Sequence, residues 1–180
     1  MIPIFNNTLG DEELEAVSEV FKSRWIGMGK ETDLFEKEFA EKIGSSEILS
    51  TNNCSNSLFL SMRALGIKEG DEVIIPTINF IATASAVLKL KAKPIFCDVD
   101  YDTLNLDVKS FEKAITKKTK SVIVLHYGGY PCEMDSIIEI CDEMNISIVE
   151  DSACSVISTY KGRNCGTMGK LGCFSFDSMK

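Results

Sequence analysis

Two ionisable residues near the end of the sequence could support covalent cofactor chemistry. Asp151 closes an apolar run that starts at residue 148, and Lys180 follows the apolar stretch 174–176. A lysine amine can form a Schiff base with the aldehyde of pyridoxal phosphate (PLP). A carboxylate can keep the pyridine nitrogen of that cofactor protonated, so that the ring accepts electrons. An aspartate at a strand end and a terminal lysine also occur in many α/β proteins without such chemistry, so the pair alone leaves both interpretations open.

Small polar residues at positions 52–57 open a predicted helix that carries Leu58, Met62 and Leu65 on one face. The free backbone N–H groups at a helix start, with a nearby hydroxyl such as that of Ser55, suit a phosphate group. Ordinary capping of the helix by an asparagine or serine is the alternative explanation for the same residues.

Strands and helices alternate along the chain from residue 48 onward. Short strands are predicted at residues 48–49, 70–76, 93–98, 121–125 and 148–151, and helices at residues 52–65, 80–90, 106–115 and 134–144. This order predicts an α/β fold with a largely parallel sheet covered by helices. Ligands of such sheets bind beyond the carboxyl ends of the strands, where Asp151 and His126 both fall. His126 could be a general acid or base there, or a structural residue.

Two further helices are predicted before the sheet. Thr8 is expected to cap the first helix, and residues 32–43 form the second. The glycine-rich segment 23–29 between them reads as a loop, in which Trp25 either packs into the core or belongs to a ligand-binding segment. Residues 160–163 are expected to form a turn. The alternating acids at positions 98, 100 and 102 lack the spacing of an EF-hand and favour a solvated loop over a metal site.

The composition excludes several classes of protein. Charged residues sum to −8 (19 Lys and Arg against 27 Asp and Glu), which argues against a general nucleic-acid partner. No apolar run approaches the roughly 18 residues of a membrane span, and no signal peptide is recognisable. The seven cysteines include no C-x-x-C pair, and with one histidine a zinc site is not expected. Reduced thiols fit a cytoplasmic protein best.

Several segments together resemble one protein family. Glu150-Asp-Ser-Ala-Cys, Tyr160-Lys-Gly-Arg and Gly169-Lys-Leu-Gly-Cys-Phe-Ser-Phe-Asp-Ser-Met-Lys180 look like the DegT/DnrJ/EryC1/StrS family of sugar aminotransferases, and the resemblance covers essentially the whole sequence. It implies that residues 1–180 form the PLP-binding large domain of PLP-dependent transferase fold type I, without the small C-terminal domain. It further implies a longer functional protein, a homodimer with a site shared between subunits.

The resemblance also assigns roles to individual residues. It implies that Lys180 holds PLP and moves the proton, and that Asp151 pairs with the ring nitrogen. The other residues implied at the cofactor are Cys54, Ser55 and Ser175 at the phosphate, Phe80 stacked on the ring, Ala153 flat against it, and Cys154 near its hydroxyl. The loop with Gly27, Met28 and Gly29 lies near the substrate in the family. Cys54 replaces a family glycine and Cys154 a family glutamine or histidine, which puts close approach to the phosphate and tuning of the ring in doubt. Phe80 could alternatively be a core residue, as most phenylalanines are.

The implied reaction transfers an amino group from glutamate to the keto group of a nucleotide-linked sugar, in the biosynthesis of a polysaccharide or glycan precursor. Some relatives are sugar dehydratases with a histidine in place of the lysine, and Lys180 favours the aminotransferases. A regulatory protein that binds PLP without transamination and a non-catalytic fragment remain as alternatives.

Overall fold

The computed structural model describes residues 8–177 of the chain, in two compact units. The described part of the first unit contains residues 8–50 and 176–177. The second unit contains residues 51–175.

The first helix of the smaller unit, α1 (Asp11–Ser23), begins later than the sequence suggested. Gly10 is its N-cap residue, and the Gly10 N–H donates to the Glu13 carboxylate at 2.7 Å. The prediction of Thr8 as the cap is therefore wrong. Acidic residues at the first three helical positions also favour this start, because negative charge stabilises a helix N-terminus.

The second helix, α2 (Lys30–Ile43), ends at Gly44 in the left-handed conformation (φ 72°). The Phe35 and Phe39 rings stack on this helix, and the Phe176 ring meets both edge-on, with centroids 5.2 and 5.3 Å away. The strand predicted at residues 48–49 is absent from the described chain. Leu49 is exposed, and the next backbone N–H, that of Ser50, donates to the Glu36 side chain instead of to a strand.

A five-stranded parallel sheet is the centre of the larger unit. Its order is β2-β1-β3-β4-β7. The strands are β1 (Glu72–Pro76), β2 (Lys93–Cys97), β3 (Thr119–Leu125), β4 (Ser147–Ser152) and β7 (Leu171–Phe174). The chain proceeds from β1 outward to β2, returns to β3, and then proceeds outward in the opposite direction. All five strands end at the same edge of the sheet, which confirms the predicted α/β architecture.

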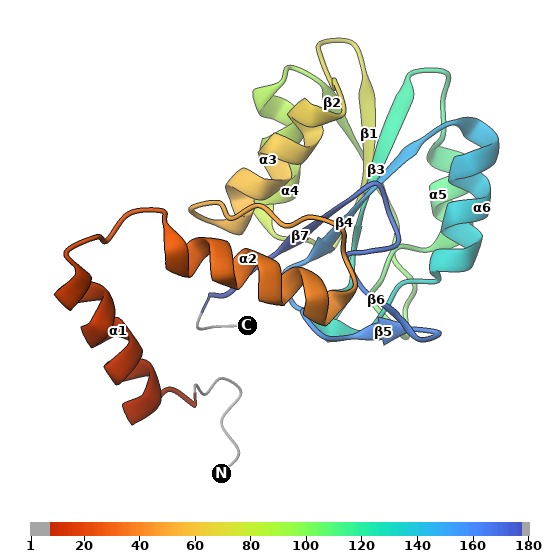
Figure 1. Cartoon of the computed structure of the whole chain (residues 1–180). Coiled ribbons are helices and arrows are strands. Elements are labelled where there is room, and N and C mark those ends of the chain that lie inside the picture. Colours follow the sequence, from red (N-terminus) through yellow and green to blue (C-terminus); the bar gives the residue numbers. More distant parts are fainter. Residues whose placement is uncertain (1–7, 178–180) are drawn as a thin grey trace. The chain divides into compact units, whose positions relative to one another are not determined.

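Helices cover both faces of this sheet (Figure 1). One face carries α3 (Cys54–Ala64) and α4 (Ile81–Lys89), and the other carries α5 (Val108–Ala114) and α6 (Met134–Met144). Helix α5 is shorter than predicted, because the Asp107 carboxylate accepts the Ser110 N–H and so caps the helix there. A 3₁₀ turn, Tyr127–Gly129, follows β3. The small hairpin of β5 (Thr159–Tyr160) and β6 (Arg163–Asn164) contains the predicted turn.

The sheet separates two hydrophobic clusters. Side chains of α3 and α4 pack against Ile75, Ile123 and Val149 of the strands. On the opposite face, side chains of α5 and α6 pack against strand residues that include Val122 and Ile148. Since successive side chains of a strand point to opposite faces, β4 is buried on both sides. Among residues 8–177, no helix is long and apolar enough to cross a membrane.

Replacing Phe111 should test the second cluster, because this side chain on α5 is fully buried. We expect Phe111→Ala to lower the free energy of unfolding by about 3–5 kcal/mol, through lost burial and the cavity left behind. Phe96→Ala on β2 is the matched control, since Phe96 is more than half exposed and should change stability by under about 1 kcal/mol. Urea denaturation followed by circular dichroism measures both. Equal effects of the two substitutions would contradict the assignment of this core.

Candidate functional site

Asp151 lies at the carboxyl end of β4 and faces α3 and α4. Its neighbour Val149, two residues earlier on the same side of the strand, belongs to the cluster beneath those helices. The Asp151 side chain is almost completely buried, and its Oδ1 accepts the Ala153 N–H at 3.2 Å. A buried carboxylate is stabilised by partners that carry a proton or a positive charge. Asp151 therefore lies at the strand end, as expected, and its role at a cofactor stays a prediction.

Cys173 of β7 pairs with Asp151 across the sheet and lies on the same face. Its Sγ lies 3.2 Å from the Ser61 Oγ of α3, so β7 packs directly on that helix. Burial raises the pKa of the Cys173 thiol to about 11, a shift to which the nearby Asp151 charge adds and which the Ser61 contact opposes. The thiol is therefore neutral near pH 7 and serves as a packing group beside the carboxylate.

The start of α3 combines a capped helix end with a serine that lines a cavity. The Asn53 side chain accepts the Asn56 N–H at 2.9 Å, so asparagine capping does occur. The Cys54 side chain packs against the α3/α4 cluster. Ser55 lines a cavity of about 260 Å³ between α3 and α4. Capping and phosphate binding are therefore compatible here, because the cap uses the Asn56 N–H and Ser55 lines the cavity.

Phe80 lies at the N-cap position of α4 and lines the same cavity as Ser55. The Phe80 side chain is 63% exposed, so the alternative of a core residue is wrong for the described chain. The structure thus brings together the residue predicted to bind a phosphate and the aromatic residue predicted to stack on a ring.

Three more predicted residues follow strands at this edge. Ala153 is buried and Cys154 is exposed in the turn after β4. Ser175 directly follows β7, and the alternation of that strand, continued by one residue, gives Ser175 the same face as Cys173 and Asp151.

His126 and Glu150 form a buried pair on the opposite face of the sheet. His126 Nε2 lies 2.9 Å from Glu150 Oε2, and both side chains are fully buried. Glu150 precedes Asp151 on β4 and so points away from it. This position agrees with a structural role for His126 and not with proton transfer beside Asp151. The sequence analysis quoted Glu150 only as part of a motif and gave it no role.

Hydrogen bonds control the ionisation of Glu150. Burial raises the pKa of this carboxyl group, but the hydrogen bonds from His126 and from the Gly169 and Gly166 N–H groups outweigh burial and leave the pKa below its ordinary value. Glu150 is therefore a carboxylate at neutral pH.

The remaining predicted residues lie elsewhere in the chain. Lys180 is outside the described residues. Gly27, Met28 and Gly29 belong to the smaller unit, where the Trp25 indole N–H donates to the Met28 carbonyl at 2.8 Å. Trp25 is 66% exposed, so its expected alternative as a core residue is wrong for this chain.

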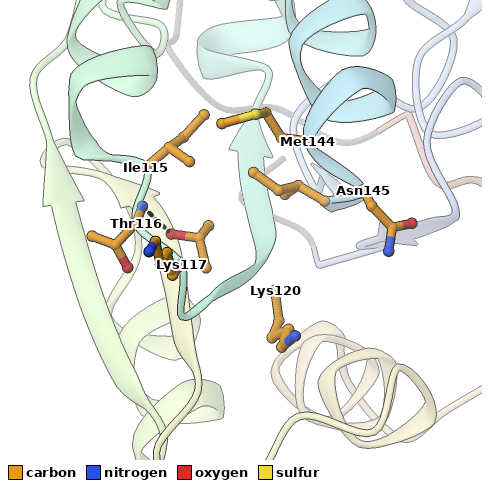
Figure 2. Close-up of a pocket in the computed structure, with 8 residues that line it drawn as sticks. Ile115, Thr116, Lys117, Lys120, Met144 and Asn145 are labelled. Atoms are coloured by element: carbon orange, nitrogen blue, oxygen red, sulfur yellow. Dashed lines mark hydrogen bonds between the residues drawn. The ribbon is translucent and has the colours of Figure 1, made fainter.

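A larger cavity of about 420 Å³ lies at the other edge of the sheet (Figure 2). It is lined by residues around the starts of β3 and β4, among them Thr119, Lys120 and Ile146. It contains none of the predicted site residues. Ligands of parallel sheets bind beyond the carboxyl ends of strands. The cavity beside Ser55 and Phe80 is therefore the better candidate for a ligand site, although it is the smaller of the two.

The residues present fit PLP. Asp151 is a buried carboxylate that can face a protonated ring nitrogen, and Phe80 offers an exposed aromatic surface. Ser55 supplies a hydroxyl at the start of an 11-residue helix, where the helix dipole favours a phosphate. Residues 8–177 contain no group of three or more His, Cys, Asp and Glu arranged to hold a metal ion.

The fold and this edge define an α/β protein of PLP-dependent transferase fold type I, and comparisons with known proteins agree. The model of the DegT/DnrJ/EryC1/StrS aminotransferase family matches residues 7–180, and the chain belongs to that family. It is 44% identical to the dTDP-4-dehydro-2,3,6-trideoxy-D-glucose 4-aminotransferase of Saccharopolyspora spinosa, over 100% of this chain and 47% of that relative. It is 39% identical to the GDP-perosamine synthase of Escherichia coli O157:H7, over 97% of this chain and 48% of that relative.

Solved structures give the same fold. The aminotransferase TlmJ of Streptoalloteichus hindustanus superposes with a TM-score of 0.96 at 48% identity, over 100% of this chain and 50% of that one. A protein of Streptococcus pneumoniae described as a sugar aminotransferase, solved in a PLP form, gives 0.91 at 28% identity over 99% and 50%. A GDP-4-keto-6-deoxymannose-3-dehydratase gives 0.91 at 29% identity over 96% and 46%. The chain spans about half the length of the curated relatives it matches.

The lowered pKa of Glu150 predicts acid-sensitive stability. The pKa of an unfolded glutamate is about 4.5 and that of the folded Glu150 is lower, so its contribution is complete above about pH 4.5 and is lost as the pH falls through the folded pKa. We expect Glu150→Gln to cost about 3 kcal/mol at pH 7 and progressively less below pH 4.5. Urea unfolding between pH 7 and pH 3 measures the difference between the two proteins. A difference that stays constant down to pH 3 would mean that folding does not lower the pKa of Glu150.

Proposed function

We propose that the whole protein is a PLP-dependent aminotransferase that transfers an amino group from glutamate to a keto group of a nucleotide-linked sugar. Polysaccharide or glycan precursor biosynthesis is the proposed setting. The relatives named above act on dTDP-linked and GDP-linked sugars by their names, and the chain shares their family. The choice of nucleotide, sugar and carbon atom is left open by this proposal.

One observation supports the proposal more than any other: Asp151 is buried at the carboxyl end of β4, on the face where α3 and α4 begin. Bound PLP would supply a protonated ring that accepts electrons from the substrate carbon. Asp151 would hold the proton on the ring nitrogen. A carboxylate removed from water keeps such a proton more strongly than one in bulk solvent.

The other residues would bind and orient the cofactor. The hydroxyls of Ser55 and Ser175 would hold the phosphate, and Phe80 would stack on the ring with Ala153 against its other side. Cys54 and Cys154 would be near neighbours of the cofactor, and Gly27, Met28 and Gly29 would lie near the sugar. The Lys180 amine would hold the cofactor and afterwards move the proton at the substrate carbon.

We further propose that residues 1–180 are the incomplete PLP-binding domain of a longer, cytoplasmic, homodimeric protein with a site shared between subunits. The chain corresponds to about half of each relative, which supports this proposal. Gel filtration of the full-length protein showing only monomer would contradict the dimer.

A sugar dehydratase is the second candidate, because the dehydratase described above has the same fold at similar coverage. Lys180 favours the aminotransferase, since amino transfer through PLP needs an amine that can hold the cofactor and move a proton. Conversion of a keto sugar to a deoxy product, without uptake of the glutamate amino group, would support the dehydratase instead.

Borohydride trapping tests the cofactor and its lysine. We expect the full-length protein, incubated with PLP and reduced, to carry a phosphopyridoxyl group on the peptide that contains Lys180, as measured by mass spectrometry. Lys180→Ala is the control and should carry none. Label spread over several surface lysines, and unchanged by Lys180→Ala, would contradict the proposed site.

Replacing Asp151 separates catalysis from cofactor binding. We expect Asp151→Asn to retain trapping at Lys180 but to slow amino transfer from glutamate by a factor of about 10²–10³, since the ring loses its charged partner. Asp135→Asn is the matched control, because Asp135 lies at the surface and pairs with Lys161 and Arg163. Amino transfer is measured by 2-oxoglutarate formation. A loss of less than threefold in Asp151→Asn would contradict the proposed role of Asp151.

A further inference from the structure

Four N–H groups converge on the buried carboxylate of Glu150. Oε2 accepts from the His126 ring at 2.9 Å and from the Gly166 backbone at 2.7 Å. Oε1 accepts from the Met168 and Gly169 backbones at 2.6 and 2.5 Å. Three of these donors come from one short segment, residues 166–169, which leads into β7. Glu150 therefore attaches that segment to β4.

His126 Nε2 can donate a hydrogen bond to Glu150 because the other ring nitrogen, Nδ1, accepts one. The Cys132 N–H donates to His126 Nδ1 at 3.1 Å, so Nδ1 carries no proton and Nε2 carries the one that faces Glu150. The histidine is thus a neutral donor held in one orientation. The four donors require two acceptor oxygens, which a carboxylate has and a glutamine amide does not.

Glycines allow the segment to lie this close to β4. A Cβ on Gly169 would lie 2.9 Å from the Ile148 carbonyl oxygen, and a Cβ on Gly172 would overlap the Gly166 carbonyl. The Lys170 N–H also donates to the Ile148 carbonyl at 2.8 Å. The next residues then pair with β4, Gly172 opposite Glu150 and Cys173 opposite Asp151.

The register of β7 decides which residues share a face with Asp151. Side chains of a strand alternate, so a shift by one residue would turn Cys173 and Ser175 to the α5/α6 face. The bonds between β4 and β7 could form in either register. The carboxylate of Glu150, which binds three particular backbone N–H groups just before β7, distinguishes between them.

We propose that Glu150 is a positioning residue that sets the register of β7 on β4, and so presents Cys173 and Ser175 on the face of the sheet where Asp151 lies. Adjacent carboxylates of one strand thus have separate roles on opposite faces. Asp151 serves the cofactor, and Glu150 aligns the strand that precedes the lysine. The part of this inference that concerns the cofactor rests on the proposed function.

The test compares Glu150→Gln with Glu72→Gln in the full-length protein. Glu72 is the matched control, because it is a buried glutamate at the start of β1 and accepts a hydrogen bond from Thr116. The first measurement is backbone hydrogen exchange of the peptide covering residues 171–175, without cofactor. We expect exchange to become at least tenfold faster in Glu150→Gln and to change less than twofold in Glu72→Gln.

The second measurement is borohydride trapping of saturating PLP on Lys180. We expect the trapped fraction to fall at least tenfold in Glu150→Gln, while Glu72→Gln stays within twofold of the wild type. Unchanged exchange in residues 171–175 would overturn the role of Glu150 in register. Faster exchange with unchanged trapping would overturn its role in preparing the proposed cofactor site.

The test still gives an answer if the wild type traps no PLP or if Glu150→Gln does not fold. If the wild type traps no PLP, the proposed function fails, and the exchange measurement still decides whether Glu150 sets the register. If Glu150→Gln does not fold, Gly169→Ala replaces it, because a Cβ there displaces one donor and leaves the carboxylate in place. Its control is Gly10→Ala, where an added Cβ meets nothing closer than 3.9 Å. Equal exchange and trapping in these two glycine variants would overturn the proposal.

Discussion

The alternation of side chains along β4 is the constraint on which the rest of the larger unit depends. This strand is buried on both faces, so every side chain from Ile148 to Ser152 is removed from water. Apolar residues pack in one cluster or the other. Glu150 and Asp151 are charged or polar, and each can be buried only with specific donors. The hydrogen bonds that satisfy Glu150 also determine where the following strand lies.

Much of the fold follows from the sequence because strong local signals agree there. Helix α6 matches its predicted bounds, and β1, β2, β3 and β4 lie within two residues of theirs. The predictions fail where a hydrogen bond to another residue outweighs the local preference of the residue type. Thr8 is a good cap by residue type, but the Glu13 side chain binds the Gly10 N–H. Residues 48–49 have strand-forming side chains, yet the backbone that follows bonds to Glu36. Neither competing partner can be recognised from residue types alone.

The residues of the candidate site also separate into those that could be predicted from the sequence and those that could not. Asp151, Ser55 and Phe80 could be named from the sequence because a family resemblance attaches roles to their motifs, and the structure gathers Ser55 and Phe80 around one cavity. The role of Glu150 could not be named, because three of its four partners are backbone N–H groups, which every residue except proline possesses. The one available signal was the recurrence of glycine at positions 166, 169 and 172. Such spacing indicates close backbone approach but does not identify the group approached.

The separate roles proposed for Glu150 and Asp151 on β4 also help to explain how one fold can support different reactions. The proteins superposed on this chain include aminotransferases and a dehydratase, so the sheet and its helices do not select the chemistry. Selection must come from side chains, and the proposed function gives the deciding role to the lysine at position 180. The lysine at position 180 follows β7 in the sequence, and a shift of β7 by one residue would reverse the faces of Cys173 and Ser175. A register set from the opposite face of the sheet leaves the cofactor face free to vary, since the Glu150 side chain points away from that of Asp151.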